Sequence, residues 1–205
     1  MRHGDVGAVA VLRFAEARTM TWRNGGGRTR EIDLEPLAGD TSRFRWRISV
    51  AEVTAGGPFS AFPGIDRVLL FCDGPRMVLT MDGADLDLVR HRPVVFRGEQ
   101  AVFCQVPGGP TRDLNVMTDR QTCSATVRVV DVAGEHRLSG VAVETAVAVV
   151  LGGALWVPGE ADSAPRPLAA YDAVKVTGGA ETELHGEGRV AIVEIGPTPS
   201  GSSPR

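Results

Sequence analysis

The stretch from residue 44 to residue 53 reads FRWRISVAEV, and it alternates cleanly at its start. Side chains of a β-strand point in turn to the two faces of a sheet, so this period of two predicts a strand with one apolar face. The apolar set is Phe44, Trp46, Ile48 and Val50, and the opposite set is Arg45, Arg47, Ser49 and Ala51.

Similar short segments lie on both sides of this stretch. Glycine (25 residues) and proline (13 residues) separate them, which is typical of strands joined by turns. No segment carries the capped, 3.6-residue apolar stripe that would predict a helix. The sequence therefore predicts an all-β sandwich or barrel. The expected strands are residues 9–15, 28–34, 44–53, 67–72, 77–81, 85–89, 93–96, 101–106, 114–118, 125–132, 143–151, 154–157, 172–177 and 190–195.

The length of 205 residues suggests two fused jelly-roll units. A turn-forming stretch, PGGP at 107–110, is the expected boundary between them. We therefore expect a first barrel at 9–110 and a second at 111–196. The remaining residues are a loose N-terminus, 1–8, and a tail, 197–205, which is rich in Pro, Gly and Ser and has little to bury.

Composition and charge exclude several classes of protein. The formal net charge is −3, whereas a protein that neutralises nucleic-acid phosphates needs a basic excess. The apolar run at 146–158 is too short for a membrane-spanning helix, and we expect no contact with a membrane. Cys72, Cys104 and Cys123 are an odd number without the close spacing of a disulfide framework or a zinc site. Free, buried thiols and a cytoplasmic location are expected.

The histidines do not predict a metal site. A catalytic metal on a β-barrel favours two histidines that alternate on one strand. The four histidines are far apart, and none has a second His or a carboxylate at ligand spacing; they are His3, His91, His136 and His185. We therefore expect neither a metal nor another cofactor. No Gly-x-Ser-x-Gly nucleophile elbow is present.

Four stretches could carry chemistry. In WRNGGGRTRE, residues 22–31, successive backbone N–H groups after the glycines could hold an anion, or the run could be only a hairpin turn. On the strand at 44–53, Arg47 is a candidate carboxylate clamp if its face lines a barrel, and a solvated side chain if it does not.

The other two stretches lie further along the chain. The loop GGPFSAFPGIDR, residues 56–67, could form the mouth of a pocket in which Phe62 packs on a ligand and Ser60 or Arg67 makes polar contacts. In DLNVM, residues 113–117, the polar face fits either a barrel lining or a capped strand start. That face carries Asp113, Asn115 and Met117.

In this order and spacing, WRNGGGRTREI, FRWRISVAEV, GPFSAFPGIDR and DLNVM resemble the HutD/Ves family of bacterial proteins, over roughly residues 10–118. The resemblance implies a cupin-type fold of two fused barrels without the typical cupin metal histidines. It also implies an accessory or regulatory role in histidine utilisation, with a small pathway acid such as N-formylglutamate as ligand. No catalytic residues come with the family. One departure is Glu99, where Asp is expected.

The motif positions that carry over include Phe59 and Asp66 besides the expected ligand-binding residues. Those expected to bind ligand are Trp22, Asn24, Gly25, Gly26, Thr29, Glu31, Arg47, Ser49, Ser60, Phe62, Arg67, Asp113 and Asn115.

Two main hypotheses of function follow. The first is a non-catalytic, metal-free binding protein for a small carboxylate. The second is a metal-independent isomerase or hydrolase in which Glu31 or Asp113 is the general base. The first is favoured because no pair of base and nucleophile is visible. A protein-interaction scaffold is a third alternative, and assembly as a homodimer is left open.

Overall fold

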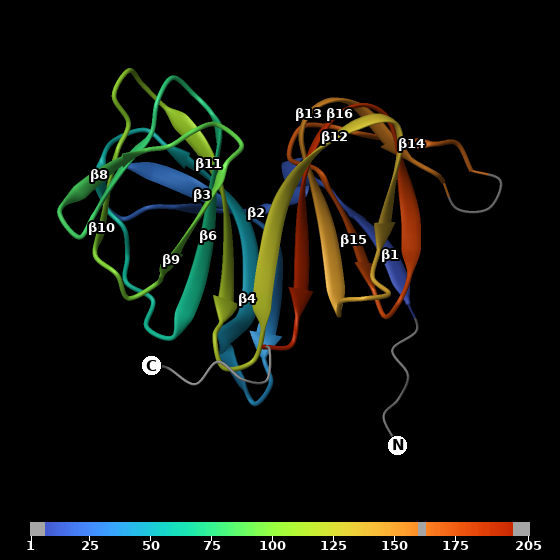
Figure 1. Cartoon of the computed structure of the whole chain (residues 1–205), viewed down its shortest axis with the longest axis horizontal. Coiled ribbons are helices and arrows are strands. Elements are labelled where there is room, and N and C mark those ends of the chain that lie inside the picture. The colour runs from blue at the N-terminus through green and yellow to red at the C-terminus, as the bar shows by residue number, and fades with distance from the viewer. Residues whose placement is uncertain (1–6, 160–162, 199–205) are drawn as a thin grey trace. The chain divides into compact units, whose positions relative to one another are not determined.

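The structure is a computed structural model that describes residues 7–159 and 163–198 (Figure 1). The all-β prediction is confirmed, because the described strands are accompanied by a single short 3-10 helix, Phe14–Glu16. No helix in the described part of the chain is long and apolar enough to cross a membrane. The chain divides into a first unit, residues 18–124 with Thr198, and a second unit, residues 7–17, 125–159 and 163–197.

The first unit contains two antiparallel sheets. The strands of the six-stranded sheet follow the order β2 (Arg18–Thr21), β3 (Gly27–Leu37), β4 (Asp40–Val53), β11 (Thr111–Asp119), β6 (Ile65–Asp73) and β9 (Pro93–Arg97). Those of the four-stranded sheet follow the order β5 (Gly57–Pro58), β10 (Val102–Gln105), β7 (Val78–Met81) and β8 (Ala84–Asp87).

Apolar side chains from both sheets form the core of the first unit. Ala51 and Leu69 of the larger sheet join Leu79 and Cys104 of the smaller one in a single buried cluster. Full burial of a Leu-sized side chain contributes roughly 1.5–3 kcal/mol, so this cluster is the main source of stability here. All three cysteines are free and buried, as expected. Burial raises the pKa of the Cys104 thiol to about 12.

Both faces of β4 are buried where it crosses the first unit. Trp46 and Ile48 on one face have no exposed surface, and Ser49 on the other is only 1% exposed. The alternation predicted from FRWRISVAEV places Arg47, Ser49 and Ala51 on the same face. Because Ala51 belongs to the core, that face looks into the unit. The structure thus selects the barrel-lining alternative for Arg47 over the solvated one.

The second unit is one sheet with an apolar core cluster. Its strand order is β1 (Ala8–Leu12), β15 (Ala173–Thr177), β13 (Thr145–Val157), β16 (Glu181–Gly196) and β12 (Ser124–Ser139), with β14 (Arg166–Leu168) paired to β13. The core includes Val150, Leu155, Leu184 and Ile192. Asp172 accepts hydrogen bonds from the Arg13 guanidinium (2.7 Å) and from the Phe14 backbone N–H (2.9 Å).

This division differs from the expected 9–110 and 111–196 in two places. β1 pairs with β15, so the first strand belongs to the second unit. β11 pairs with both β4 and β6 and is an inner strand of the first unit. Neither pairing is local in sequence, and a Pro-Gly turn does not reveal it. The expected terminal segments 1–8 and 197–205 lie largely outside the described residues.

Candidate functional site

A cavity of about 470 Å³ lies in the first unit, against the inward face of β4 and β11. Most of the residues expected to bind ligand line it, although they come from four stretches far apart in the sequence. The predicted residues in the lining are Trp22, Asn24, Thr29, Arg47, Ser49, Ser60, Phe62, Arg67, Asp113 and Asn115.

Three predicted residues do not line the cavity. Gly25 adopts a φ of 70°, and the Gly26 N–H donates to Asn24 Oδ1 (3.0 Å). These two glycines therefore shape the turn that carries the lining residues Trp22 and Asn24. Glu31 lies outside the lining next to a register shift in β3, although its charge still acts on Arg47. The glycine run is therefore a hairpin turn at the edge of the cavity.

Further lining residues lie next to predicted ones. Ala51 and Met117 follow from the strand alternation, and the others are sequence neighbours of Trp22 or of the Phe59 loop. The lining residues that the sequence analysis left off its binding list are Thr21, Arg23, Ala51, Pro58, Phe59 and Met117.

A chain of buried polar groups runs along one wall of the cavity. Arg67, only 6% exposed, donates from Nε (3.3 Å) and Nη2 (2.9 Å) to Asn115 Oδ1. Asn115 Nδ2 in turn donates to Asp113 Oδ1 (2.8 Å). The amide of Asn115 therefore stands between the guanidinium and the carboxylate, and the two charged groups are linked only through it among the described contacts.

Burial shifts the pKa of both charged ends of this chain. It lowers the pKa of Arg67 to about 10, with Asp113 opposing the shift and Arg47 adding to it. It raises the pKa of Asp113 to about 6, against the hydrogen bond from Asn115 and the charge of Arg67. Desolvation penalises the charged form of each group, and here it outweighs the favourable partners.

Aromatic rings hold the Arg67 guanidinium in place. Its central carbon lies 5.0 Å from the ring centre of Phe59 and 4.9 Å from that of Phe96. Such cation–π contacts are worth about 0.5–2 kcal/mol when desolvated. Phe62 lies between the two cationic groups, 5.8 Å from Arg67 and 5.9 Å from Arg47.

Arg47 is the least satisfied cation of the cavity. Its Nη2 donates to the Met117 sulfur (3.2 Å), a weak acceptor, and its Nε is buried without a hydrogen-bond partner among the described residues. Desolvation lowers the pKa of Arg47, and the charge of Glu31 opposes this shift. An unmet buried donor of this kind costs about 1–3 kcal/mol, which an incoming acceptor would recover.

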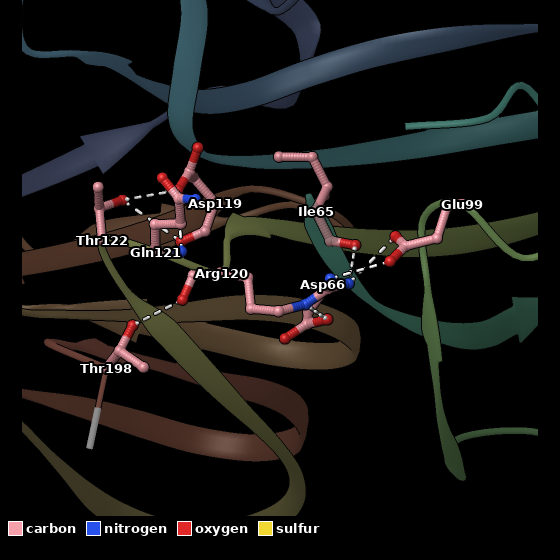
Figure 2. Close-up of polar contacts among 8 residues, drawn as sticks. All are labelled: Ile65, Asp66, Glu99, Asp119, Arg120, Gln121, Thr122 and Thr198. Carbon is pink, nitrogen blue, oxygen red and sulfur yellow. Dashed lines mark hydrogen bonds and ion pairs between the residues drawn. The ribbon is translucent and has the colours of Figure 1, made fainter. Parts of the chain in front are cut away.

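Arg120 makes a network of hydrogen bonds at the start of β6 (Figure 2), and the loop that contains Phe62 directly precedes this strand. Arg120 donates to Asp66 Oδ1 (2.7 Å) and to Glu99 Oε1 (2.9 Å), and also to the carbonyl oxygen of Ile65 (3.2 Å). The hydrogen bonds, and to a smaller extent the opposite charges, raise the pKa of Arg120 and lower that of Glu99 to about 2. Because Asp66 directly precedes Arg67, this network fixes the start of β6.

The cavity lining favours an anion and does not fit a metal ion. Its charged side chains are three guanidiniums, from Arg23, Arg47 and Arg67, and one carboxylate, from Asp113. It contains neither His nor Cys among the described residues. A cation would meet one carboxylate ligand and three like charges, whereas a carboxylate would find paired donors.

The second unit contains a separate group of metal-ligating side chains. Glu135, Glu183 and His185 place ligand atoms within 4.8 Å of one another, and His185 stacks on Trp156. The expectation that no histidine has a carboxylate at ligand spacing is therefore corrected, because Glu183 and His185 share one face of β16. Two members are exposed carboxylates, which are common without an ion, and we assign none here.

The chain is similar to several known proteins. The HutD family model matches residues 14–193. Protein Ves from Citrobacter koseri is 42% identical over 112 residues, or 54% of this chain and 58% of Ves, so less than two thirds of that relative is matched. A 21.2 kDa protein encoded in the region 3′ of hutC in Pseudomonas putida is 32% identical over 190 residues, 90% of this chain and 96% of that one.

Solved structures agree with these matches. HutD from Pseudomonas fluorescens SBW25 is similar with a TM-score of 0.79 at 31% identity, over 93% of this chain and 99% of that one. Two cupin-like proteins share the fold at low identity. Ylba from E. coli has a TM-score of 0.71 at 9% identity, over 95% of this chain and 92% of its own. A variant of Bacillus subtilis oxalate decarboxylase has a TM-score of 0.61 at 10% identity, over 94% of this chain and 78% of its own. The predicted cupin-like, all-β fold is thereby confirmed.

Proposed function

The chain belongs to the HutD family, and we propose that it is a non-catalytic, metal-free binding protein for a small carboxylate. The ligand would occupy the cavity of the first unit. In the finer architecture that we propose, each unit is one jelly-roll barrel of a bicupin. In this arrangement only the first barrel carries the ligand site.

The observation that carries the proposal is the pair of guanidiniums in the cavity. Arg47 is partly buried and Arg67 is buried, and burial lowers the pKa of both. Nε of Arg47 has no partner among the described residues. Hydrogen bonds between a guanidinium and a carboxylate are roughly twice as strong as neutral ones, so a carboxylate is the ligand group that best offsets this burial.

N-formylglutamate is the ligand that we propose to test first. A cavity of about 470 Å³ is within the range of roughly 300–1,000 Å³ that small-molecule sites occupy. The relative encoded beside hutC supports the link to histidine utilisation that the motif resemblance implies. Binding without turnover would suit an accessory or regulatory factor that senses the level of a pathway acid.

Isothermal calorimetry tests this function directly. The purified full chain is titrated with N-formylglutamate, formate, urocanate and glutamate. We expect Arg47→Met to weaken binding of the best ligand at least tenfold. Arg97→Met is the matched control, because Arg97 is exposed on β9 and outside the cavity lining. Absence of heat with all four compounds would overturn the proposal, as would equal affinity in Arg47→Met and the wild type.

Asp113 also supports the second candidate, a metal-independent isomerase or hydrolase. A carboxylate in a cavity with a pKa raised to about 6 is suited to take up a proton near neutral pH. Glu31, the other proposed base, is outside the lining. Turnover of a histidine-pathway intermediate that is lost in Asp113→Asn would favour this candidate. Binding without turnover by the wild type would exclude it for the compounds tested.

A further inference from the structure

One carboxylate oxygen of the cavity lining has no hydrogen-bond donor among the described residues. Asp113 is 1% exposed; Asn115 satisfies its Oδ1, while its Oδ2 is buried without a hydrogen-bond partner among the described residues. Asp113 also belongs to the cavity lining. An ionised oxygen in this position costs at least about 1–3 kcal/mol unless a donor reaches it.

The neighbouring protein groups already have other partners. Both hydrogen bonds described for Arg67 go to Asn115 Oδ1 rather than to Asp113. The Asn115 amide cannot turn over, because Arg67 only donates and an ionised Asp113 only accepts. Asn115 thus donates to Asp113 Oδ1, and Asp113 Oδ2 is left to accept a hydrogen bond from a ligand in the cavity.

The strand register places opposite charges at opposite ends of the lining. Arg47 on β4 and Arg67 on β6 are the ladder partners of Met117, one on each side of β11. Asp113 lies four residues away on the same strand and the same face, about 13 Å at 3.3 Å per residue. The Arg67 guanidinium reaches back to Asn115, so Arg47 marks the cationic end of the wall and Asp113 the anionic end.

We propose that the cavity selects acids that also carry a hydrogen-bond donor, with Asp113 Oδ2 accepting from an amide N–H or ammonium group of the ligand. The inference rests on the proposed binding function and names its ligand class: amino acids and N-acylamino acids, bound with a carboxylate toward Arg47 and the nitrogen toward Asp113. Carboxylates without a nitrogen donor can pair only with Arg47 at the cationic end of the cavity wall. The buried, unpaired Asp113 would discriminate against them, because they leave it without a donor.

Three ligands and one substitution test this selection. N-formylglutamate has the N–H donor, its N-methyl analogue lacks it, and glutarate lacks the nitrogen entirely. In calorimetry on the wild type near pH 8, we expect N-methylation to weaken binding at least tenfold. In Asp113→Asn, Asn115 Nδ2 needs an acceptor, so the new amide turns its oxygen to Asn115 and its NH₂ to the ligand. The ratio of the affinities for N-formylglutamate and for its N-methyl analogue, called the gap below, should then shrink to less than threefold.

The controls separate recognition of the N–H donor from the effect of the size of the N-methyl group and from a folding defect of the variant. A penalty caused by the size of the N-methyl group persists in Asp113→Asn, which is nearly isosteric with the wild type, and would overturn the inference. Asp85→Asn, an exposed carboxylate outside the cavity, should leave the gap unchanged. If Asp113→Asn does not fold, the wild type is measured near pH 5, where protonation of Asp113 should narrow the gap. An unchanged gap would overturn the inference.

The two proposals fail in different ways. Equal binding of N-formylglutamate and its N-methyl analogue by the wild type would refute donor selection and leave carboxylate binding intact. If none of these ligands and none of the four acids in the earlier panel gives heat, carboxylate binding itself is refuted.

Discussion

Replacing Asp113 by Asn should stabilise the unliganded protein at neutral pH. Burial raises the pKa of Asp113 from 3.8 to about 6, because the ionised carboxylate loses its hydration inside the first unit. One pKa unit corresponds to about 1.36 kcal/mol, so a shift of about two units costs about 3 kcal/mol of unfolding free energy once the group is ionised. The nearly isosteric amide carries no charge and avoids this cost.

The direction of the shift fixes the sign of the pH dependence. The folded state binds the proton more tightly than the unfolded state. The contribution of Asp113 to stability is therefore fully present below pH 3.8 and is lost as the pH rises through about 6. The unfolding free energy of the wild type minus that of Asp113→Asn should fall by about 2–2.5 kcal/mol between pH 4 and pH 7. Carboxylates with lowered pKa values, such as Glu52, cancel in this difference.

Urea unfolding at a series of pH values measures this difference. Trp46 is fully buried in the first unit, and once Trp156 of the second unit is replaced by Phe in every protein compared, the remaining tryptophan fluorescence reports the unfolding of the first unit. Asp85→Asn, which changes an exposed carboxylate, should give a nearly constant difference from the wild type. A difference that stays flat or rises with pH for Asp113→Asn would refute the argument that desolvation dominates this group.

Three other substitutions test the framework around the cavity. Arg120→Met removes hydrogen bonds to two carboxylates and a backbone oxygen. Because the Arg120 side chain is 32% exposed, we expect the unfolding free energy in urea to fall by only about 1–2 kcal/mol, and Arg97→Met should show no such fall. Gly27→Ala would place a Cβ 2.4 Å from a backbone oxygen, so its Tm should fall by several degrees, whereas Gly152→Ala, which meets nothing within 4 Å, should change Tm little. Leu79→Ala should cost about 2–5 kcal/mol in the same urea assay, and a loss below about 1 kcal/mol would show that the core collapses around the missing side chain.

Alternation along single strands predicted much of the cavity. A period of two places Arg47 beside Ser49 and Asp113 beside Asn115, and both pairs line the cavity as the same-face reasoning requires. The sequence could not predict which face of β4 looks into the cavity, because both faces of this strand are buried and its apolar residues do not mark the cavity side. That choice depends on strand pairing over long sequence distances.

The register across the sheet was equally hidden. β11 lies between β4 and β6, which brings Arg47 and Arg67 to the two sides of Met117. No local pattern encodes this arrangement, since the pairing joins residues 50 to 70 positions apart. The position of the glycine run was hidden for a related reason: Gly25 and Gly26 lie outside the cavity lining and provide the turn conformation, whereas the neighbouring Trp22 and Asn24 line the cavity.

Buried polar groups gather beside the cavity of the first unit. Among the described residues, Arg67, Asp113 and Asn115 are buried there, and Asp113 Oδ2 and Arg47 Nε have no hydrogen-bond partner. The second unit also buries polar groups: Asp172 accepts hydrogen bonds from Arg13, Phe14 and Ala169, and His136 Nε2 and Arg166 Nε have no partner among the described residues. Buried charges weaken a fold unless something pairs with them. A ligand that meets both Arg47 and Asp113 would therefore stabilise the first unit and leave the second unchanged.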